Sequence, residues 1–135
     1  MTKLRNLKIT VADCNEEGLV LENESIFPWS EIGTFGKCEY PGRELTWSLY
    51  YLQKKNDPKN IWIPSLGRFP LFRNDAREKR ERYLKSKIIR YTKNVPHLRF
   101  VIKVTHFGKE RPWNIEEEQA RDRYWDSPAA EQAHR

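Results

Sequence analysis

The spacing of apolar residues changes once along this chain, and that change constrains the fold more than any other feature. Before about residue 64, apolar and polar residues alternate in short runs such as LKITV and LTWSLYYLQ, which is typical of β-strands. From residue 75 the spacing becomes helical, which places Leu84, Ile88 and Tyr91 on one side of a helix over about 75–93. The sequence therefore predicts an α+β fold, in which one long helix packs onto a bent antiparallel sheet or a partly open barrel.

Two further elements are expected after this helix. The run LRFVIKVTHF alternates again and predicts an extra strand. The run NIEEEQARDRYW begins with Asn114 and has Glu117 three residues later, the pattern of a capping box, and it predicts a short helix. We therefore expect one β-rich domain over residues 1–110, followed by a short helix and a flexible tail over 111–135.

A proline and a tryptophan interrupt the strand pattern near residue 28. Pro28 cannot donate a ladder hydrogen bond, so it belongs at a strand edge or break. Trp29 follows this fixed backbone point, and we expect its ring to be buried near the long helix or the strand ends. Gly33 and Gly36 lie inside the next strand pattern, where glycine indicates a bulge, a bend or a close backbone approach.

The segment GLVLENESIFPWSEIGTF, residues 18–35, resembles bacterial pleckstrin-homology-like domains, in which a Pro-Trp-x-x-Ile corner joins two strands. The resemblance implies a fold of about seven strands closed by a helix, and a role as a binding scaffold. This chain departs from that pattern, because it shows five or six strands before the helix and a strong strand after it. A different α+β fold therefore stays open as an alternative.

The composition indicates a soluble protein of one domain. A chain of 135 residues can bury one core, and its apolar runs are shorter than the roughly 18–20 residues of a membrane span. The first residues turn polar by Asp13, unlike a secretion signal, so a cytoplasmic location is expected. Cys14 and Cys38 show no CxxC spacing and are expected to be buried thiols, with a bridge between them as the alternative in an exported chain.

The residue types of catalytic and metal sites do not cluster in this sequence. His97, His106 and His134 are isolated from one another, and neither a metal-binding histidine motif nor a phosphate-binding loop is present. We therefore expect no catalytic residues, no bound metal and no cofactor, and we expect that the protein is not an enzyme.

Charge is distributed unevenly along the chain. Residues 75–93 contain eight basic and three acidic residues, whereas residues 110–135 contain seven acidic and four basic ones. The basic helix has two interpretations: a solvated outer face supported by pairs four residues apart, or a surface that contacts phosphates. In the second interpretation, the contacts would come from Arg77, Arg80, Lys87 and Arg90.

The resulting functional hypothesis is a small, non-catalytic binding module that recognises a protein partner. An immunity protein, which neutralises a toxin by binding it, is one form of this role. Tyr50 and Trp62 are the candidate aromatic centre of the binding surface, with cations of the helix as its rim. The alternative is an anionic-lipid or nucleic-acid binder that uses residues 77–93.

Overall fold

The fold contains two sheets and two helices in the part of the chain that the structure describes. The structure is a computed structural model, and it describes residues 6–8, 10–42, 47–57, 59–63, 66, 75–105 and 107–128. Its larger sheet has the order β1-β7-β6-β5-β8-β9, formed by Asn6–Lys8, Asn60–Trp62, Trp47–Lys54, Ile32–Tyr40, Arg99–Val104 and Arg111–Pro112. A smaller sheet contains β2 (Val11–Cys14), β3 (Gly18–Leu21) and β4 (Ile26–Pro28), and the helices are α1 (Asp75–Thr92) and α2 (Ile115–Trp125).

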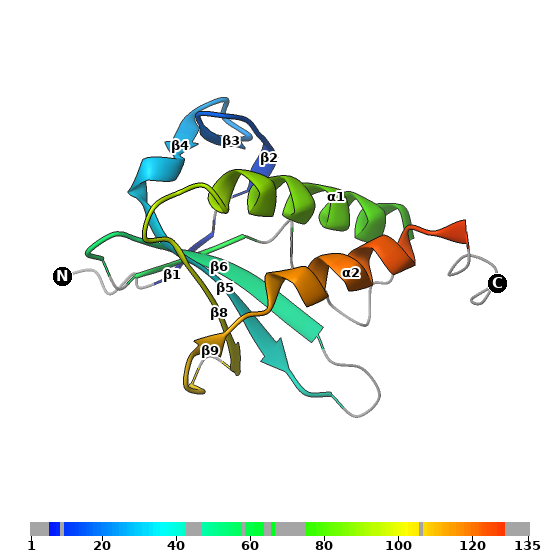
Figure 1. The fold of residues 1–135 in the computed structure, drawn as a ribbon. Coiled ribbons are helices and arrows are strands. Elements are labelled where there is room, and N and C mark those ends of the chain that lie inside the picture. The colour runs from blue at the N-terminus through cyan, green and yellow to red at the C-terminus, as the bar shows by residue number, and fades with distance from the viewer. Residues whose placement is uncertain are drawn as a thin grey trace.

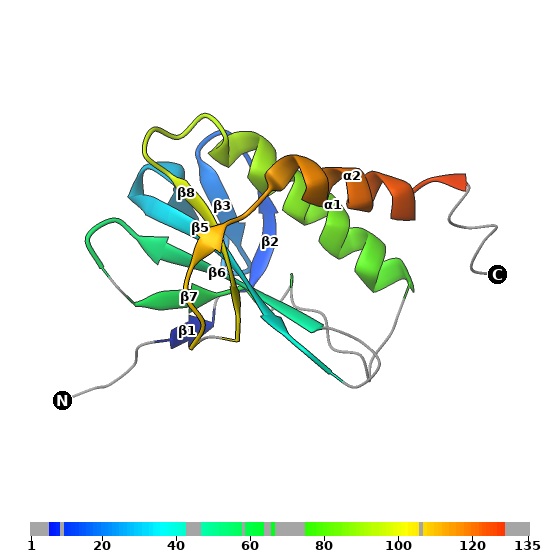
Figure 2. The same ribbon diagram turned by 60° about the horizontal axis from the view of Figure 1, so that its bottom comes forward.

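Both helices lie on one face of the six-stranded sheet, and the small sheet lies beside α1 (Figures 1 and 2). The predicted α+β class is confirmed, whereas the prediction of an antiparallel sheet is wrong for two strand pairs. Strand β5 pairs antiparallel with β6 but parallel with β8, and β1 pairs parallel with β7. The reason is the crossover: α1 carries the chain from β7 back across the sheet, so β8 runs in the same direction as β5. The described strands leave β1 and β9 as open edges, so they form no closed barrel.

Helix α1 occupies the range that its apolar spacing predicts. Leu84, Ile88 and Ile89 are buried in the main core, and Tyr91 packs against it. Leu84, Ile88 and Tyr91 are spaced by four and three positions, so they share one side of the helix with the adjacent Ile89, and this side faces the sheet. The expected packing of Leu84, Ile88 and Tyr91 is confirmed.

The Pro-Trp segment forms the corner that its sequence predicts. A short 3₁₀ turn, η1 (Trp29–Glu31), joins β4 to β5, and Pro28 stands directly before it. The Trp29 ring is buried and stacks on Tyr91 of α1, with ring centroids 5.9 Å apart. Its indole Nε1 donates a hydrogen bond of 2.7 Å to the carbonyl oxygen of Asn15. The corner thus ties the small sheet to the end of α1.

A second, smaller core lies on the sheet face away from the helices. It contains Cys38, Tyr51 and Val101, with Trp62 packed against them. The Tyr51 ring lies over Gly36 on the neighbouring strand, so close that a Cβ atom at position 36 would overlap the ring. The predicted close approach at Gly36 is confirmed, and the register shift between Ile32 and Thr34 places a bulge at Gly33.

Replacing Gly36 with alanine is expected to destabilise the protein by about 1–3 kcal/mol, because the added methyl group displaces a ring that is fully buried. Gly33→Ala is the matched control, since its Cβ would lie 3.4 Å from the Lys55 Cα, an ordinary contact. Chemical denaturation of both variants checks this. Equal loss of stability in the two variants would show that the ring does not occupy the space above Gly36.

The cysteines, the helices and the C-terminal tail were each the subject of a prediction. Both cysteines are buried and free, with Cys14 in the main core and Cys38 in the second core. Neither described helix combines the length and apolar content needed to cross a bilayer. Residues 129–135, which belong to the predicted flexible tail, lie outside the described part of the chain.

Candidate functional site

Helix α2 is positioned by its first turn. The Asn114 side chain accepts a hydrogen bond of 3.0 Å from the Glu117 backbone N–H, so the predicted cap is present. Ile115 and Glu118, three residues apart, are both buried on the side of α2 that faces the sheet, next to the buried Trp113 ring. The fold therefore places the Glu118 carboxylate inside the protein.

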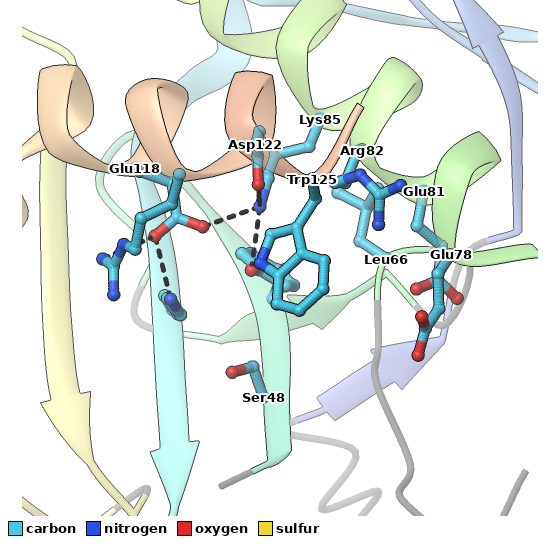
Figure 3. A pocket seen from close by; sticks show the side chains of 12 residues that line it. Ser48, Leu66, Glu78, Glu81, Arg82, Lys85, Glu118, Asp122 and Trp125 are labelled. Atoms are coloured by element: carbon cyan, nitrogen blue, oxygen red, sulfur yellow. Dashed lines mark hydrogen bonds and ion pairs between the residues drawn. The ribbon is translucent and has the colours of Figure 1, made fainter. Parts of the chain in front are cut away.

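Glu118 is the centre of a buried network of charges (Figure 3). Its Oε1 accepts hydrogen bonds from Lys37 Nζ at 2.9 Å and from Trp113 Nε1 at 3.2 Å. Its Oε2 accepts a bond of 2.6 Å from Lys85 Nζ, which also donates to Asp122 Oδ1 at 3.1 Å. The network joins β5, α1 and α2, three elements that are distant in the sequence.

These contacts hold the network in its charged state. Burial alone raises the pKa of Glu118, but the charges of Lys85 and Lys37 outweigh it and lower the pKa to about 2. Burial likewise opposes the charge of Lys85, yet Tyr50, Glu118 and Asp122 raise its pKa above the ordinary value. Burial also raises the pKa of Asp122, against the attraction of Lys85.

A cavity of about 190 Å³ opens beside this network, between the two helices and the sheet. Ser48 of β6 contributes to its sheet side, and Trp125 of α2 lies at its helix side (Figure 3). Tyr50 of β6 also lines it. Basic and acidic residues are balanced in its lining, which consists of Lys37, Ser48, Tyr50, Leu66, Glu78, Glu81, Arg82, Lys85, Glu118, Arg121, Asp122 and Trp125.

The protonation states of Glu118 and Lys85 differ from those of a general base and of a lysine nucleophile. A carboxylate with a pKa of about 2 is a very weak base near neutral pH, and general base catalysis needs a pKa near the working pH. A lysine nucleophile needs a lowered pKa, whereas that of Lys85 is raised. The hydrogen bonds of Glu118 to Lys37 and Lys85 fasten α2 to the sheet and to α1. Among the described residues, no group of histidine, cysteine and acidic side chains is arranged to hold a metal ion, and His106 and His134 lie outside those residues.

The predicted aromatic patch does not exist. Tyr50 is only 6% exposed and packs on the core face of β6, where Lys85 Nζ donates to its hydroxyl at 3.4 Å. Tyr51 is the residue after Tyr50 in β6. It pairs with Trp62 of β7, and the two rings pack together with their centroids 5.6 Å apart. Because neighbouring residues of a strand point to opposite faces, Tyr50 and Trp62 lie on different faces of the sheet.

The four predicted helix cations all have contacts within the protein. Arg77 pairs with Glu81 at 3.1 Å, and Arg90 lies over the Tyr91 ring. Arg80 donates to the Ala12 carbonyl at 2.6 Å, and Lys87 pairs with Asp13 at 2.9 Å, which lowers the Asp13 pKa chiefly through that hydrogen bond. Other cations of α1 and the turn after it pair with acidic residues of α2 and the turn that follows α2: Lys85 with Asp122, Arg82 with Asp126, and Lys93 with Glu116.

Tyr83 is a surface residue that the sequence analysis missed. Its ring is 49% exposed on α1 and lies between two cations, with Arg80 Cζ 5.5 Å and Lys87 Nζ 5.4 Å from the ring centroid. The signal was present in the sequence, because Arg80 and Lys87 stand three residues before and four residues after Tyr83, on one side of a helix. We call Arg80, Tyr83 and Lys87 the α1 patch.

Comparison of the chain with models of known protein families, with curated proteins and with solved structures finds no match. The resemblance to pleckstrin-homology-like domains therefore stays a prediction from residues 18–35.

Proposed function

We propose that this protein is a non-catalytic binding module that recognises a protein partner through the α1 patch. The observation that carries the proposal is the position of Tyr83, an exposed aromatic ring held between two cations. Tyrosine and arginine are enriched among the residues that contribute most to protein interfaces. The partner's surface would contain an apolar pocket for the ring, with acidic residues around it.

The two cations of the α1 patch are held by contacts within the protein. The Arg80 guanidinium is hydrogen-bonded to the Ala12 carbonyl, and the Lys87 ammonium is paired with Asp13, so β2 holds both cations in place. Ordering a flexible side chain on binding costs about 0.5–1.5 kcal/mol, and a side chain that is already fixed avoids much of this cost. The geometry thus favours binding at this surface.

Other ion pairs weigh against phosphate binding along α1, the alternative for the basic helix. Lys85 and Arg82 of α1, and Lys93 directly after it, are paired with acidic residues of α2 and the turn after it, so part of the positive charge of residues 75–93 is balanced within the protein. A phosphate surface needs cations that can release counterions on binding. The immunity-protein form of the proposed role stays a prediction from the sequence.

Site-specific cross-linking tests the proposal. Both native cysteines are buried, so a Ser86→Cys variant carries one accessible thiol, on the exposed side of α1 near Tyr83. Labelled there with a photoreactive group, the protein is expected to cross-link a partner in extracts of its own cells, and Tyr83→Ala in the same background should abolish the product. A Glu117→Cys label on α2 is the control position. Equal products from both positions, or a product that survives Tyr83→Ala, would contradict the proposal.

Replacing Tyr83 with alanine is expected to weaken binding of the cross-linked partner by more than about 2 kcal/mol, while the melting temperature stays within about 2 °C of the wild type. The ring is half exposed, so its loss removes contact area from the interface but little from the core. Tyr124→Ala is the matched control, because Tyr124 is exposed to a similar extent on α2. Isothermal calorimetry and thermal melts measure the two quantities.

A further inference from the structure

A second concave surface lies where β5 begins and β6 ends, away from the cavity under α2. It has a volume of about 550 Å³ and is formed by the start of β5, the end of β6 with its turn, and the segment before β8. We call it the β5–β6 groove; its lining residues are Gly33, Thr34, Gln53, Lys54, Lys55, Asn56, Asp57, His97 and Arg99.

The β5–β6 groove has a cationic lining. It contains three basic residues, Lys54, Lys55 and Arg99, and one carboxylate, Asp57. By contrast, acidic and basic residues are balanced in the cavity under α2 and in the concavity at the start of that helix, which has Arg111 and Arg121 opposite Glu39 and Glu117. The groove therefore differs from both in the sign of its charge.

The cations of the groove are less neutralised than those of α1. Within the described residues, Lys54 and Lys55 have no carboxylate at ion-pair distance, and the Lys54 ammonium lies 5.4 Å from the centroid of the Phe27 ring. Arg99 is paired with Glu110 at 3.3 Å in a solvent-exposed contact, and its other terminal nitrogen donates to the Thr34 hydroxyl at 3.2 Å. Contact with an aromatic ring orients an ammonium group without removing its charge.

We propose that the β5–β6 groove binds a phosphate monoester. Three basic residues and one carboxylate line the groove, and this excess of positive charge suits a group with three acceptor oxygens and nearly two negative charges. Lys54 ends β6, Lys55 follows it in the turn, and Arg99 begins β8, so the cations that line the groove come from two separate parts of the chain and can bond a tetrahedral anion from different sides. Its lining has no Phe, Tyr or Trp ring on which a nucleobase could stack, and the His97 imidazole is the one ring in the lining, so we take the phosphate group itself as the recognised feature. This site is independent of the α1 patch and lies on different elements.

The test is a titration of the full chain with glycerol 3-phosphate, followed by amide chemical shifts. Saturable shifts are expected at Thr34, Lys55 and Arg99. The double variant Lys54→Gln/Lys55→Gln should weaken the affinity roughly tenfold or more, because each lost charged hydrogen bond has an effect of that order. The matched control is Lys79→Gln/Arg90→Gln, which removes two charges from the exposed side of α1. Equal weakening in both variants, or shifts that do not saturate, would overturn the proposal.

A second pair of probes separates the sources of such a phosphate. If the natural ligand is a phosphorylated side chain of a protein, a phosphoserine peptide should bind more tightly than glycerol 3-phosphate. If it is a small phosphorylated molecule, the two should bind equally. Either result agrees with a phosphate site, whereas equal binding of the peptide with aspartate in place of phosphoserine would overturn it. Tyr83→Ala should leave phosphate binding unchanged, so this site and the proposed protein interface can fail separately.

Discussion

Replacing Glu118 with alanine is expected to destabilise the fold by about 3–5 kcal/mol, because the change leaves Lys37 and Lys85 buried without their shared carboxylate. Each lysine side chain is less than a tenth exposed, so water cannot easily replace the lost partner. Glu117→Ala is the matched control: it removes the neighbouring carboxylate from the exposed side of α2 and should cost less than about 1 kcal/mol. Urea denaturation gives both free energies of unfolding, and similar values for the two variants would contradict the buried network.

The same network predicts how stability depends on pH. The Glu118 pKa is lowered from 4.5 to about 2 on folding, so its contribution is fully present above pH 4.5 and is lost as pH falls from there to about 2. A shift of that size corresponds to about 3 kcal/mol. The Asp122 pKa is raised by burial, so this group acts in the opposite direction and offsets part of the loss. Over this range, Glu118→Gln should lose less stability than the wild type, and equal losses would contradict the assignment.

Ile88→Asp is expected to unfold the protein or nearly so. The Ile88 side chain is fully buried between α1 and the sheet, so the variant combines the loss of an apolar contact with a buried, unpaired carboxylate. The cost is several kcal/mol, of the order of the roughly 5–15 kcal/mol that stabilises a typical domain. Ser86→Asp, two residues earlier on the exposed side of α1, places the same charge in solvent and should melt like the wild type.

A graded variant keeps this prediction measurable if Ile88→Asp does not fold. Ile88→Val removes one methylene group and should lower the free energy of unfolding by about 0.5–1.5 kcal/mol. Circular dichroism melts of the three variants give the order of stability. An unchanged melting temperature in Ile88→Asp would contradict the packing of α1 on the sheet.

The elements with one clear apolar side could be predicted from the sequence. The spacing of Leu84, Ile88 and Tyr91 defines both the bounds and the inward side of α1, and Pro28 with Trp29 defines the corner before β5. Strand β6 could not be oriented in this way, because it has apolar residues on both faces and both faces are packed. Alternation alone does not say which face holds the main core, so Tyr50 was placed on the wrong one.

The buried network could not be predicted from the sequence, for a different reason. Lys37 and Glu118 are 81 residues apart, and charged residues in a strand or helix are usually solvated, so only the packing of α2 on β5 brings them together. The direction of β8 likewise depends on the path of α1 across the sheet. The α1 patch could have been predicted from the sequence, because its three residues share one side of a helix whose position the sequence predicts.

The salt dependence of partner binding tests the proposed protein interface most directly. We expect an interface centred on the Tyr83 ring to lose less than about tenfold in affinity between roughly 0.05 and 0.2 M salt, with Tyr83→Ala weaker than the wild type at every concentration. A phosphate surface formed by the four predicted cations of α1 would instead lose about a hundredfold or more over that range. A steep fall of this kind, together with equal affinities of the wild type and Tyr83→Ala, would contradict recognition through the α1 patch.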